Sequence, residues 1–125
     1  MGFEVLVVED SAAMRSFIAS TIEEIEGVEV VEAESGFEAL KKLPRHRFNI
    51  IITDINMPDI NGLELIRFIR ENEQYQDTPL IIVSTESSQR DRERGLALGA
   101  NAYLVKPFSP GELRDCVNKY LKTDG

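Results

Sequence analysis

The sequence is poor in the residues that several common functions require. Its 125 residues include one cysteine, Cys116, and one histidine, His46. A single cysteine excludes an internal disulfide and fits a reducing compartment. Basic residues are also scarce, with 14 Lys and Arg against 22 Asp and Glu, so the formal net charge is −8. This balance disfavours a nucleic-acid surface, which depends on clustered Lys and Arg.

Long apolar stretches and nucleotide-binding motifs are missing as well. No run of eighteen apolar residues occurs, and the first residues do not place a basic region before an apolar one. We therefore predict neither a membrane span nor a signal peptide. The absence of G-x-G-x-x-G, G-x-x-x-x-G-K-[ST] and G-x-S-x-G disfavours dinucleotide binding, P-loop nucleotide binding and a hydrolytic triad. The length is that of one domain, so we predict a single cytoplasmic domain over residues 1–125.

Two isolated residues have ordinary structural interpretations. His46 lies between Arg45 and Arg47 and is predicted to be a solvated loop residue, because histidine is seldom fully buried. Cys116 falls on the apolar face of a predicted helix and is predicted to belong to the core.

Short apolar runs rich in β-branched residues alternate with amphipathic stretches of helical length. A buried strand in a parallel sheet is apolar on both faces, so these runs predict strands. The run 28–33 contains two glutamates and is predicted to be an edge strand. The predicted strands cover residues 5–8, 28–33, 50–52, 80–83 and 103–105.

The stretches between these runs predict helices around residues 14–25, 37–40, 63–69, 87–99 and 110–121. Pro44 prevents the second helix from continuing. Ser109 and Glu112 form a capping box for the last helix. The segment 87–94 has no apolar side chain, so its helix is predicted to pack lightly. The alternation predicts an α/β fold of five βα units, a doubly wound parallel sheet with helices on both faces.

Polar residues stand directly after four of the predicted strands. Taken singly, each is best explained as a helix cap or a loop residue. Parallel strands, however, place their carboxyl ends at one edge of the sheet, where ligands of such folds bind. The residues predicted to converge there are Glu9, Asp10, Asp54, Ser84, Thr85 and Lys106.

The charges of this cluster predict a metal site. Glu9, Asp10, Asp54 and Lys106 sum to −2, and two like charges about 4 Å apart repel by roughly 4 kcal/mol at an effective dielectric constant of about 20. A divalent cation would neutralise the sum. The ligands are oxygens, which favours Mg²⁺, Mn²⁺ or Ca²⁺ over zinc, and their small number favours Mg²⁺.

A carboxylate beside a metal and a lysine can attack phosphorus and form an aspartyl phosphate. Asp54 is the best candidate for this nucleophile because it stands alone after the middle strand of the cluster. Lys106 and a Ser84 hydroxyl would stabilise the phosphoryl oxygens.

Four ordered motifs resemble the receiver domain of two-component response regulators, CheY-like in type, over essentially the whole chain. The resemblance implies the fold of that family, with strand order 2-1-3-4-5. The motifs are Glu9-Asp10-Ser11, Asp54-x-Asn56-Met57-Pro58-x-x-Asn61-Gly62, Ser84, and Tyr103-Leu104-Val105-Lys106-Pro107-Phe108.

The resemblance also implies roles for single residues. Asp54 would accept a phosphoryl group from a phosphohistidine of a sensor histidine kinase or phosphotransfer protein. Mg²⁺, or Mn²⁺ in its place, would be held by Glu9, Asp10, Asp54 and the backbone carbonyl of Asn56. Lys106 would contact the phosphoryl oxygens, and the peptide bond between Lys106 and Pro107 would be cis.

Ser84 and Tyr103 match the switch pair of this family. The hydroxyl would move to the phosphate, the ring would turn inward, and an output protein would bind the face built from the fourth helix, fifth strand and fifth helix. Tyr103 has an alternative interpretation, simple packing with its hydroxyl at the surface. Thr85 departs from the small residue usual at its position, and with Asn56 and Glu86 it would tune the phosphoryl lifetime.

Two further interpretations stay open. A Mg²⁺-dependent phosphatase would use the same aspartate, but such enzymes usually carry an acid where this chain has Asn56. The chain ends soon after the last predicted helix, which favours a stand-alone regulator in chemotaxis over a receiver excised from a longer protein.

Overall fold

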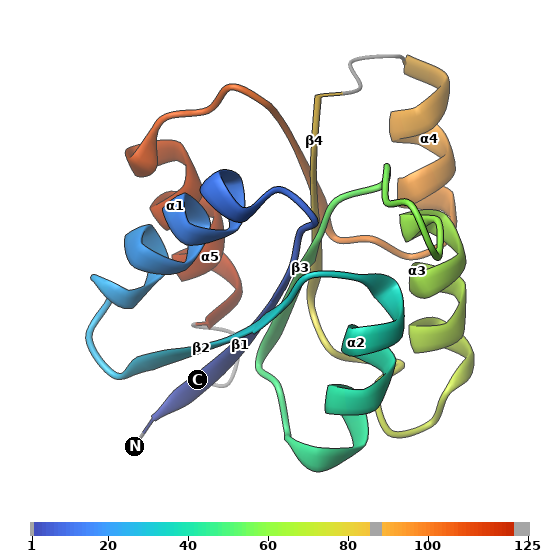
Figure 1. The fold of residues 1–125 in the computed structure, drawn as a ribbon, viewed down its shortest axis with the longest axis horizontal. Helices are drawn as coiled ribbons and strands as arrows, with labels where there is room; N and C mark the ends of the chain where they lie inside the picture. The colour runs from blue at the N-terminus through green and yellow to red at the C-terminus, as the bar shows by residue number, and fades with distance from the viewer. Residues whose placement is uncertain (1, 86–88, 122–125) are drawn as a thin grey trace.

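The computed structural model describes residues 2–85 and 89–121, and Figure 1 shows its three layers. A parallel sheet in the order β2-β1-β3-β4-β5 forms the middle layer. Helices α1 and α5 cover one face and helices α2, α3 and α4 cover the other. The strands are β1 (Phe3–Val8), β2 (Val28–Ala33), β3 (Ile50–Thr53), β4 (Leu80–Ser84) and β5 (Ala102–Val105). The helices are α1 (Ala12–Glu23), α2 (Gly36–Lys42), α3 (Gly62–Glu71), α4 (Gln89–Ala97) and α5 (Pro110–Leu121).

The predicted five βα units and the implied strand order are therefore confirmed. The apolar runs 5–8, 50–52 and 80–83 form the three inner strands, β1, β3 and β4, and the more polar β2 is an edge strand as predicted. A short 3-10 helix, η1 (Leu43–Arg45), contains Pro44 and ends the second helical segment. None of the helices in the described part of the chain has the length and apolar character needed to span a bilayer.

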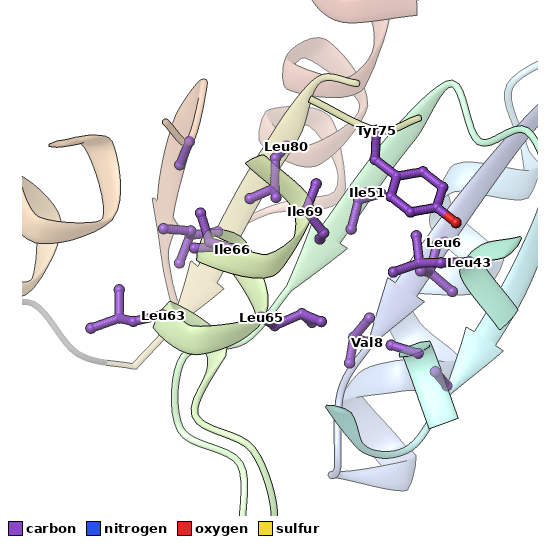
Figure 2. Close-up of a cluster of buried hydrophobic side chains, with 14 of the residues drawn as sticks. Leu6, Val8, Leu43, Ile51, Leu63, Leu65, Ile66, Ile69, Tyr75 and Leu80 are labelled. Carbon is purple, nitrogen blue, oxygen red and sulfur yellow. The ribbon is translucent and has the colours of Figure 1, made fainter. Parts of the chain in front are cut away.

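Each face of the sheet has its own hydrophobic core. The core under α2 and α3 is built around Leu6, Ile51, Ile66 and Ile69, all fully buried, and is drawn in Figure 2. The core under α1 and α5 contains Ile18, Ile22 and Val117. Both faces of every inner strand are packed, and a shift of one residue would move each side chain to the other face. The pairing register of each strand is therefore fixed, and with it the residue at which the strand ends.

Helix α4 packs more lightly, as predicted. Gly95 is its buried residue, and a Cβ atom at this position would lie 2.4 Å from Cδ1 of Ile82. The helix therefore approaches β4 through a glycine and exposes most of its side chains, Leu96 among them. The first predicted residues of this helix, Ser87 and Ser88, lie outside the described residues, as do Glu86 and the chain end at 122–125.

One prediction about the loop before β3 is wrong. His46 is half-buried, its Nδ1 lies 3.1 Å from Oε2 of Glu4, and its ring stacks on Phe48 with 5.1 Å between the ring centroids. A pairing across 42 residues of sequence has no local signal, so the loop was expected to leave the ring in solvent. Cys116 is half-buried and packs against the core under α1 and α5, as predicted.

The amino-terminal edge of the sheet is held together by Arg70, at the end of α3. Burial lowers the pKa of Arg70 from its ordinary value, and the charge of Asp77 opposes this effect. All the acceptors of its guanidinium are neutral oxygens of the loops before β4 and β5: the carbonyls of Gly99 (2.9 Å), Tyr75 (3.3 Å), Gln76 (3.1 Å) and Thr78 (2.8 Å), and Oδ1 of Asn101 (3.0 Å).

Candidate functional site

The carboxyl ends of β1 and β3 bring two carboxylates together. In the parallel pairing Val8 lies opposite Thr53, the last residue of β3. The backbone N–H of Asp54 donates to the carbonyl of Val8 at 3.1 Å, so the ladder holds the nucleophile candidate at the end of the strand. Glu9 follows Val8 directly and therefore emerges beside Asp54.

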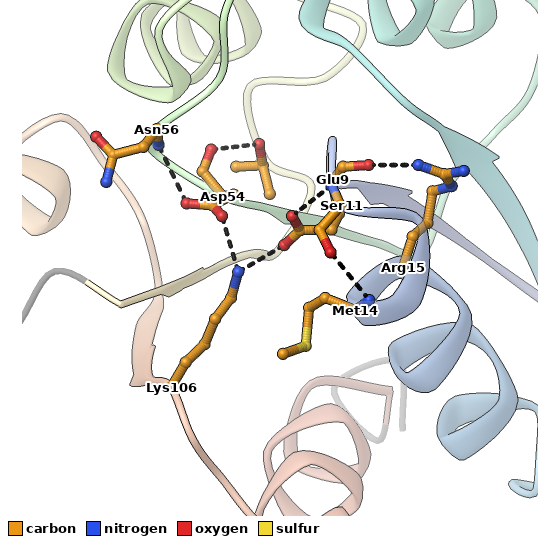
Figure 3. A network of polar contacts seen from close by, with 8 residues as sticks. Glu9, Ser11, Met14, Arg15, Asp54, Asn56 and Lys106 are labelled. Atoms are coloured by element: carbon orange, nitrogen blue, oxygen red, sulfur yellow. Dashed lines mark hydrogen bonds and ion pairs between the residues drawn. The ribbon is translucent and has the colours of Figure 1, made fainter.

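Lys106 joins these two carboxylates. Its Nζ lies 2.7 Å from Oε1 of Glu9 and 2.8 Å from Oδ2 of Asp54, and Figure 3 shows the ammonium between them. Glu9 is 1% exposed and Asp54 6% exposed. Lys106 directly follows β5. Its backbone N–H donates to the carbonyl of Ser84 at 2.8 Å, and this bond fixes the position of the residue. The peptide bond between Lys106 and Pro107 is cis, as the resemblance implied.

Glu9 is anchored from several sides. Its second carboxylate oxygen accepts from the backbone N–H of Ser11 at 3.0 Å, and its carbonyl accepts from Nη1 of Arg15 at 2.8 Å. Ser11 also caps α1, since its hydroxyl accepts from the backbone N–H of Met14. The start of the helix and the acidic side chain therefore hold each other in place.

Burial is the largest influence on the pKa values of Glu9 and Lys106. Burial raises the pKa of Glu9 above its usual 4.5, although the hydrogen bonds from Lys106 and Ser11 oppose the rise and the charge of Asp54 adds to it. Burial would lower the pKa of Lys106, but its hydrogen bonds to Asp54 and Glu9 outweigh burial and raise that pKa. Lys106 is therefore positive at neutral pH, and Glu9 carries its negative charge at a free-energy cost.

A third carboxylate completes the cluster. Asp10 is exposed, and Glu9, Asp10 and Asp54 each offer an oxygen within 4.8 Å of the others. Three carboxylates and one ammonium leave an excess of negative charge around a set of hard oxygen ligands. The donor set fits Mg²⁺, because this ion binds through one or two carboxylates together with water and phosphate oxygens.

The loop after β3 is built to hold Asp54. The carboxylate oxygen that does not face Lys106 accepts from the backbone N–H of Asn56 at 3.1 Å. The Thr53 hydroxyl donates to the Asp54 carbonyl at 3.0 Å. Gly62 packs directly on this backbone: a Cβ atom at position 62 would lie 2.2 Å from the Asp54 carbonyl oxygen and 2.6 Å from Cα of Ile55. Only a glycine allows α3 to start so close to the loop.

Asp59 ties the same loop to α2. Its two carboxylate oxygens accept from the backbone N–H groups of Gly36 at 3.2 Å and Phe37 at 3.0 Å, at the first turn of α2. The bond from Phe37, the largest contribution, lowers the pKa of Asp59. The loop after β3 therefore contains a second anchored carboxylate. Sequence reasoning missed this anchor, because its partners lie 22 and 23 residues away.

The structure places the remaining predicted residues around the same edge. Ser84 is fully buried at the end of β4, and Thr85 is exposed beside it. Tyr103 is half-buried on β5 and packs against the core under α2 and α3. Every predicted side chain except that of Tyr103 thus follows or ends a strand at the carboxyl-terminal edge.

The chain is a member of the response regulator receiver domain family, which matches residues 5–118. It is 40% identical over 121 residues to a CheY homolog, a chemotaxis protein of Campylobacter jejuni, across 96% of this chain and 93% of that protein. A receiver domain belongs to two-component signalling and is not a conventional enzyme, so the phosphatase interpretation is set aside.

Solved structures agree on the fold. The chemotaxis response regulator CheY4 of Vibrio cholerae superposes with a TM-score of 0.89 at 38% identity, over 96% of this chain and 99% of that chain. The receiver domain of a sensor histidine kinase from Pseudomonas aeruginosa superposes with a TM-score of 0.87 at 30% identity, over 97% and 98% of the two chains. That structure has a magnesium ion coordinated in its active site cleft.

Proposed function

We propose that Asp54 is the phosphoryl acceptor of this receiver domain. The observation that carries the proposal is the position of its carboxylate, buried between the Asn56 N–H and the Lys106 ammonium at the edge where three acidic groups meet. In the transfer, one carboxylate oxygen attacks the phosphorus of a phosphohistidine. A P–O bond forms, the P–N bond breaks, and the imidazole nitrogen takes the electron pair and then a proton. The kinase or phosphotransfer protein thereby becomes the donor partner.

Glu9, Asp10 and Asp54, together with the backbone carbonyl of Asn56, would hold Mg²⁺, with Mn²⁺ as the substitute. When bound, the ion would supply positive charge beside the phosphoryl oxygens. The carboxylate excess of the site supports this assignment. Glu9 is held by Ser11 and Lys106 in a fixed position, so the site is organised before the ligand arrives.

Lys106 changes partner during the reaction. Before transfer its ammonium contacts the Asp54 carboxylate at 2.8 Å. After transfer a phosphoryl oxygen carries the charge that this carboxylate has lost, and the ammonium binds that oxygen. The contact with Glu9 at 2.7 Å keeps Lys106 in place through the exchange. Lys106 is therefore a catalytic residue for self-phosphorylation.

Ser84 and Tyr103 form the switch. The Ser84 hydroxyl binds a phosphoryl oxygen and the Tyr103 ring turns inward behind it. The phosphoryl group stabilises one conformation over the other through contacts that exist only in the phosphorylated state. The output protein binds the face of α4, β5 and α5, where α4 is lightly packed and β5 exposes Val105. Thr85, Asn56 and Glu86 set the lifetime of the phosphoryl group.

The biological setting is chemotaxis, carried out by a single-domain regulator in the cytoplasm. This assignment rests on the relatives, which are named as chemotaxis proteins and which the chain matches over nearly their whole length.

Phosphorylation by a small donor tests the acceptor directly. Incubation with acetyl phosphate and Mg²⁺ should add one phosphoryl group to the intact protein, measured by mass spectrometry. Asp54→Asn should not gain it, because an amide oxygen is a poor nucleophile. Asp115→Asn serves as the matched control, because it removes an exposed carboxylate of α5 that contacts neither the acceptor nor the loop that holds it. If Asp54→Asn gains the group as fast as the wild type, the assignment is wrong.

A further inference from the structure

A cavity of about 320 Å³ opens at the amino-terminal edge of the sheet, the edge opposite the acidic cluster. This volume lies at the small end of the range for ligand pockets, about 300–1,000 Å³. Its walls come from two loops, the one that enters β3 and the one that enters β4. Phe48, which is half-buried, and the ring of Tyr75 supply the accessible apolar part of the lining, and the fully buried Leu43 and Ile51 lie behind them. The proposed function makes no use of this cavity.

A buried tyrosine presents an unpaired hydroxyl to this cavity. Tyr75 is 8% exposed, lines the cavity, and packs in the same core as Leu43 (Figure 2). Within residues 2–85 and 89–121 its hydroxyl has no hydrogen-bond partner. In the same part of the chain no side-chain polar atom that is buried from solvent lacks a partner. The hydroxyl oxygen must therefore reach accessible space, and the space beside it is the cavity.

A cation without a carboxylate partner also lines the cavity. In the described residues no carboxylate oxygen lies within 4.0 Å of the Arg47 guanidinium, and the cavity lining contains no Asp or Glu. The neighbouring His46 is already paired with Glu4 and stacked on Phe48, so it fixes the aromatic wall. An apolar wall, a hydroxyl donor and an available guanidinium are complementary to an aromatic ring that bears a carboxylate.

The net charge of −8 opposes anion binding only weakly here. Charges more than about 8–10 Å apart in solvent are largely screened at physiological ionic strength. The carboxylates of the acidic cluster lie at the other edge of the sheet, beyond the full length of β3. Arg47 is the cation of the cavity lining, and the Glu4 carboxylate, 3.1 Å from Nδ1 of the lining residue His46, also contributes to the local field.

We propose that this cavity is a binding site for a small aromatic monocarboxylate. The ring packs against the accessible parts of Phe48 and of the Tyr75 ring, the carboxylate pairs with Arg47, and the Tyr75 hydroxyl donates to an oxygen of the ligand. The site is separate from the phosphoryl acceptor. Binding should therefore be the same in the wild type and in Asp54→Asn, and failure of one proposal leaves the other intact.

Titration of the ¹⁵N-labelled protein with benzoate, phenylacetate and indole-3-acetate, followed by amide chemical shifts, tests the proposal. At least one probe should give saturable shifts at Arg47, Phe48, Tyr75 and Thr78, with a dissociation constant of about 1 mM, as expected for a ligand of one or two rings. Phenylacetamide, the neutral analogue, should bind about tenfold more weakly than phenylacetate because it lacks the charge-assisted bond.

Variants separate this site from general anion binding. Arg47→Gln should weaken carboxylate binding about tenfold. Tyr75→Phe should weaken it about threefold while keeping the ring that fills the core. Arg45→Gln, which removes a neighbouring charge outside the lining, should leave the affinity unchanged. Three results would overturn the proposal: no saturable shifts with any probe, equal affinity for the amide and the acid, or loss of binding in Arg45→Gln as large as in Arg47→Gln.

Discussion

At the carboxyl-terminal edge of the sheet three carboxylates surround one ammonium, whereas at the amino-terminal edge one guanidinium is surrounded by five neutral oxygens. Arg70 needs no further partner, because oriented carbonyl dipoles satisfy its donors without adding charge. Glu9, Asp10 and Asp54 repel one another more than Lys106 can offset. Arg70 is therefore a satisfied link between two loops, whereas the acidic cluster retains repulsion that a cation or a phosphoryl transfer can relieve.

The same edges differ in how their backbone is fixed. Arg70 fastens the loops that enter β4 and β5, so the ends of those strands that lie far from the site are immobilised. At the site itself, Gly62 and Asp59 fasten the loop after β3 to α3 and α2. The contacts of Arg70 and the contacts of Gly62 and Asp59 thus both support the position of Asp54. Each set of contacts can be removed separately by substitution.

The largest effect on stability is expected from Arg70→Met. The substitution deletes five hydrogen bonds of a partly buried cation and leaves their carbonyl acceptors to solvent, which should lower the free energy of unfolding by about 2–4 kcal/mol. Urea denaturation measures this loss. Arg67→Met on the same helix should change stability by less than about 0.5 kcal/mol, because Arg67 is exposed and its ion pair with Glu64 spans 3.9 Å. Equal effects of the two substitutions would refute the role given to Arg70.

Gly62→Ala should have the next largest effect. The new methyl group would enter the space of the Asp54 carbonyl, so the loop must shift, with an expected loss of about 1–3 kcal/mol. The rate of phosphorylation by acetyl phosphate should fall with it, since the acceptor moves. Gly111→Ala is the control, because the nearest atom to its Cβ is Oγ of Ser109 at 3.8 Å. That variant should keep wild-type stability within about 0.5 kcal/mol and the wild-type rate.

Removal of one carboxylate from the acidic cluster should change the free energy of unfolding by a smaller amount and in the opposite direction. Asp10→Asn relieves repulsion, so without Mg²⁺ the free energy of unfolding should stay equal or rise by up to about 0.5 kcal/mol. Stabilisation by added Mg²⁺ should decrease, because the ion loses a ligand and binding to the folded state is the source of the stabilisation. Asp115→Asn on α5 should show the full Mg²⁺ effect. A destabilised Asp10→Asn with normal Mg²⁺ response would contradict the account.

The pH dependence of stability should show the smallest effect. The raised pKa of Glu9 means that the folded state binds its proton more tightly than the unfolded state does. The contribution of Glu9 is therefore fully present below about pH 4.5 and is lost as the pH rises through the pKa of the folded protein. Glu9→Gln should flatten this decline, and saturating Mg²⁺ should flatten it in the wild type. The measurement is the free energy of unfolding at a series of pH values, with Glu29→Gln as an exposed control.

Much of the site could be predicted because it depends on local signals. A polar residue after an apolar run identifies a strand end, and parallel strands bring such ends together, so the sequence alone predicts that Glu9, Asp54 and Lys106 meet at one edge of the sheet. The family resemblance added the cis bond before Pro107. The inner strands were predicted for the same reason, since burial on both faces leaves a continuous apolar run.

The contacts that sequence reasoning missed all join segments that are distant in the sequence, most of them through a backbone group. Asp59 caps a helix 22 residues earlier in the chain, and Arg70 binds carbonyl oxygens, which every residue possesses. The pairing of His46 with Glu4 spans 42 residues. Such contacts leave no periodicity and no motif, because backbone donors and acceptors do not depend on residue type and the paired side chains lie far apart in the sequence.

The most direct test of the acceptor is chemical mapping of the phosphorylated residue. The protein is treated with acetyl phosphate and Mg²⁺, and the acyl phosphate is reduced with sodium borohydride, which converts a phosphorylated aspartate to homoserine. Peptide sequencing by mass spectrometry should find homoserine at position 54 and aspartate at positions 10 and 59. Homoserine at position 10, or none at position 54 in a protein that has gained the phosphoryl group, would contradict the assignment of Asp54 as the acceptor.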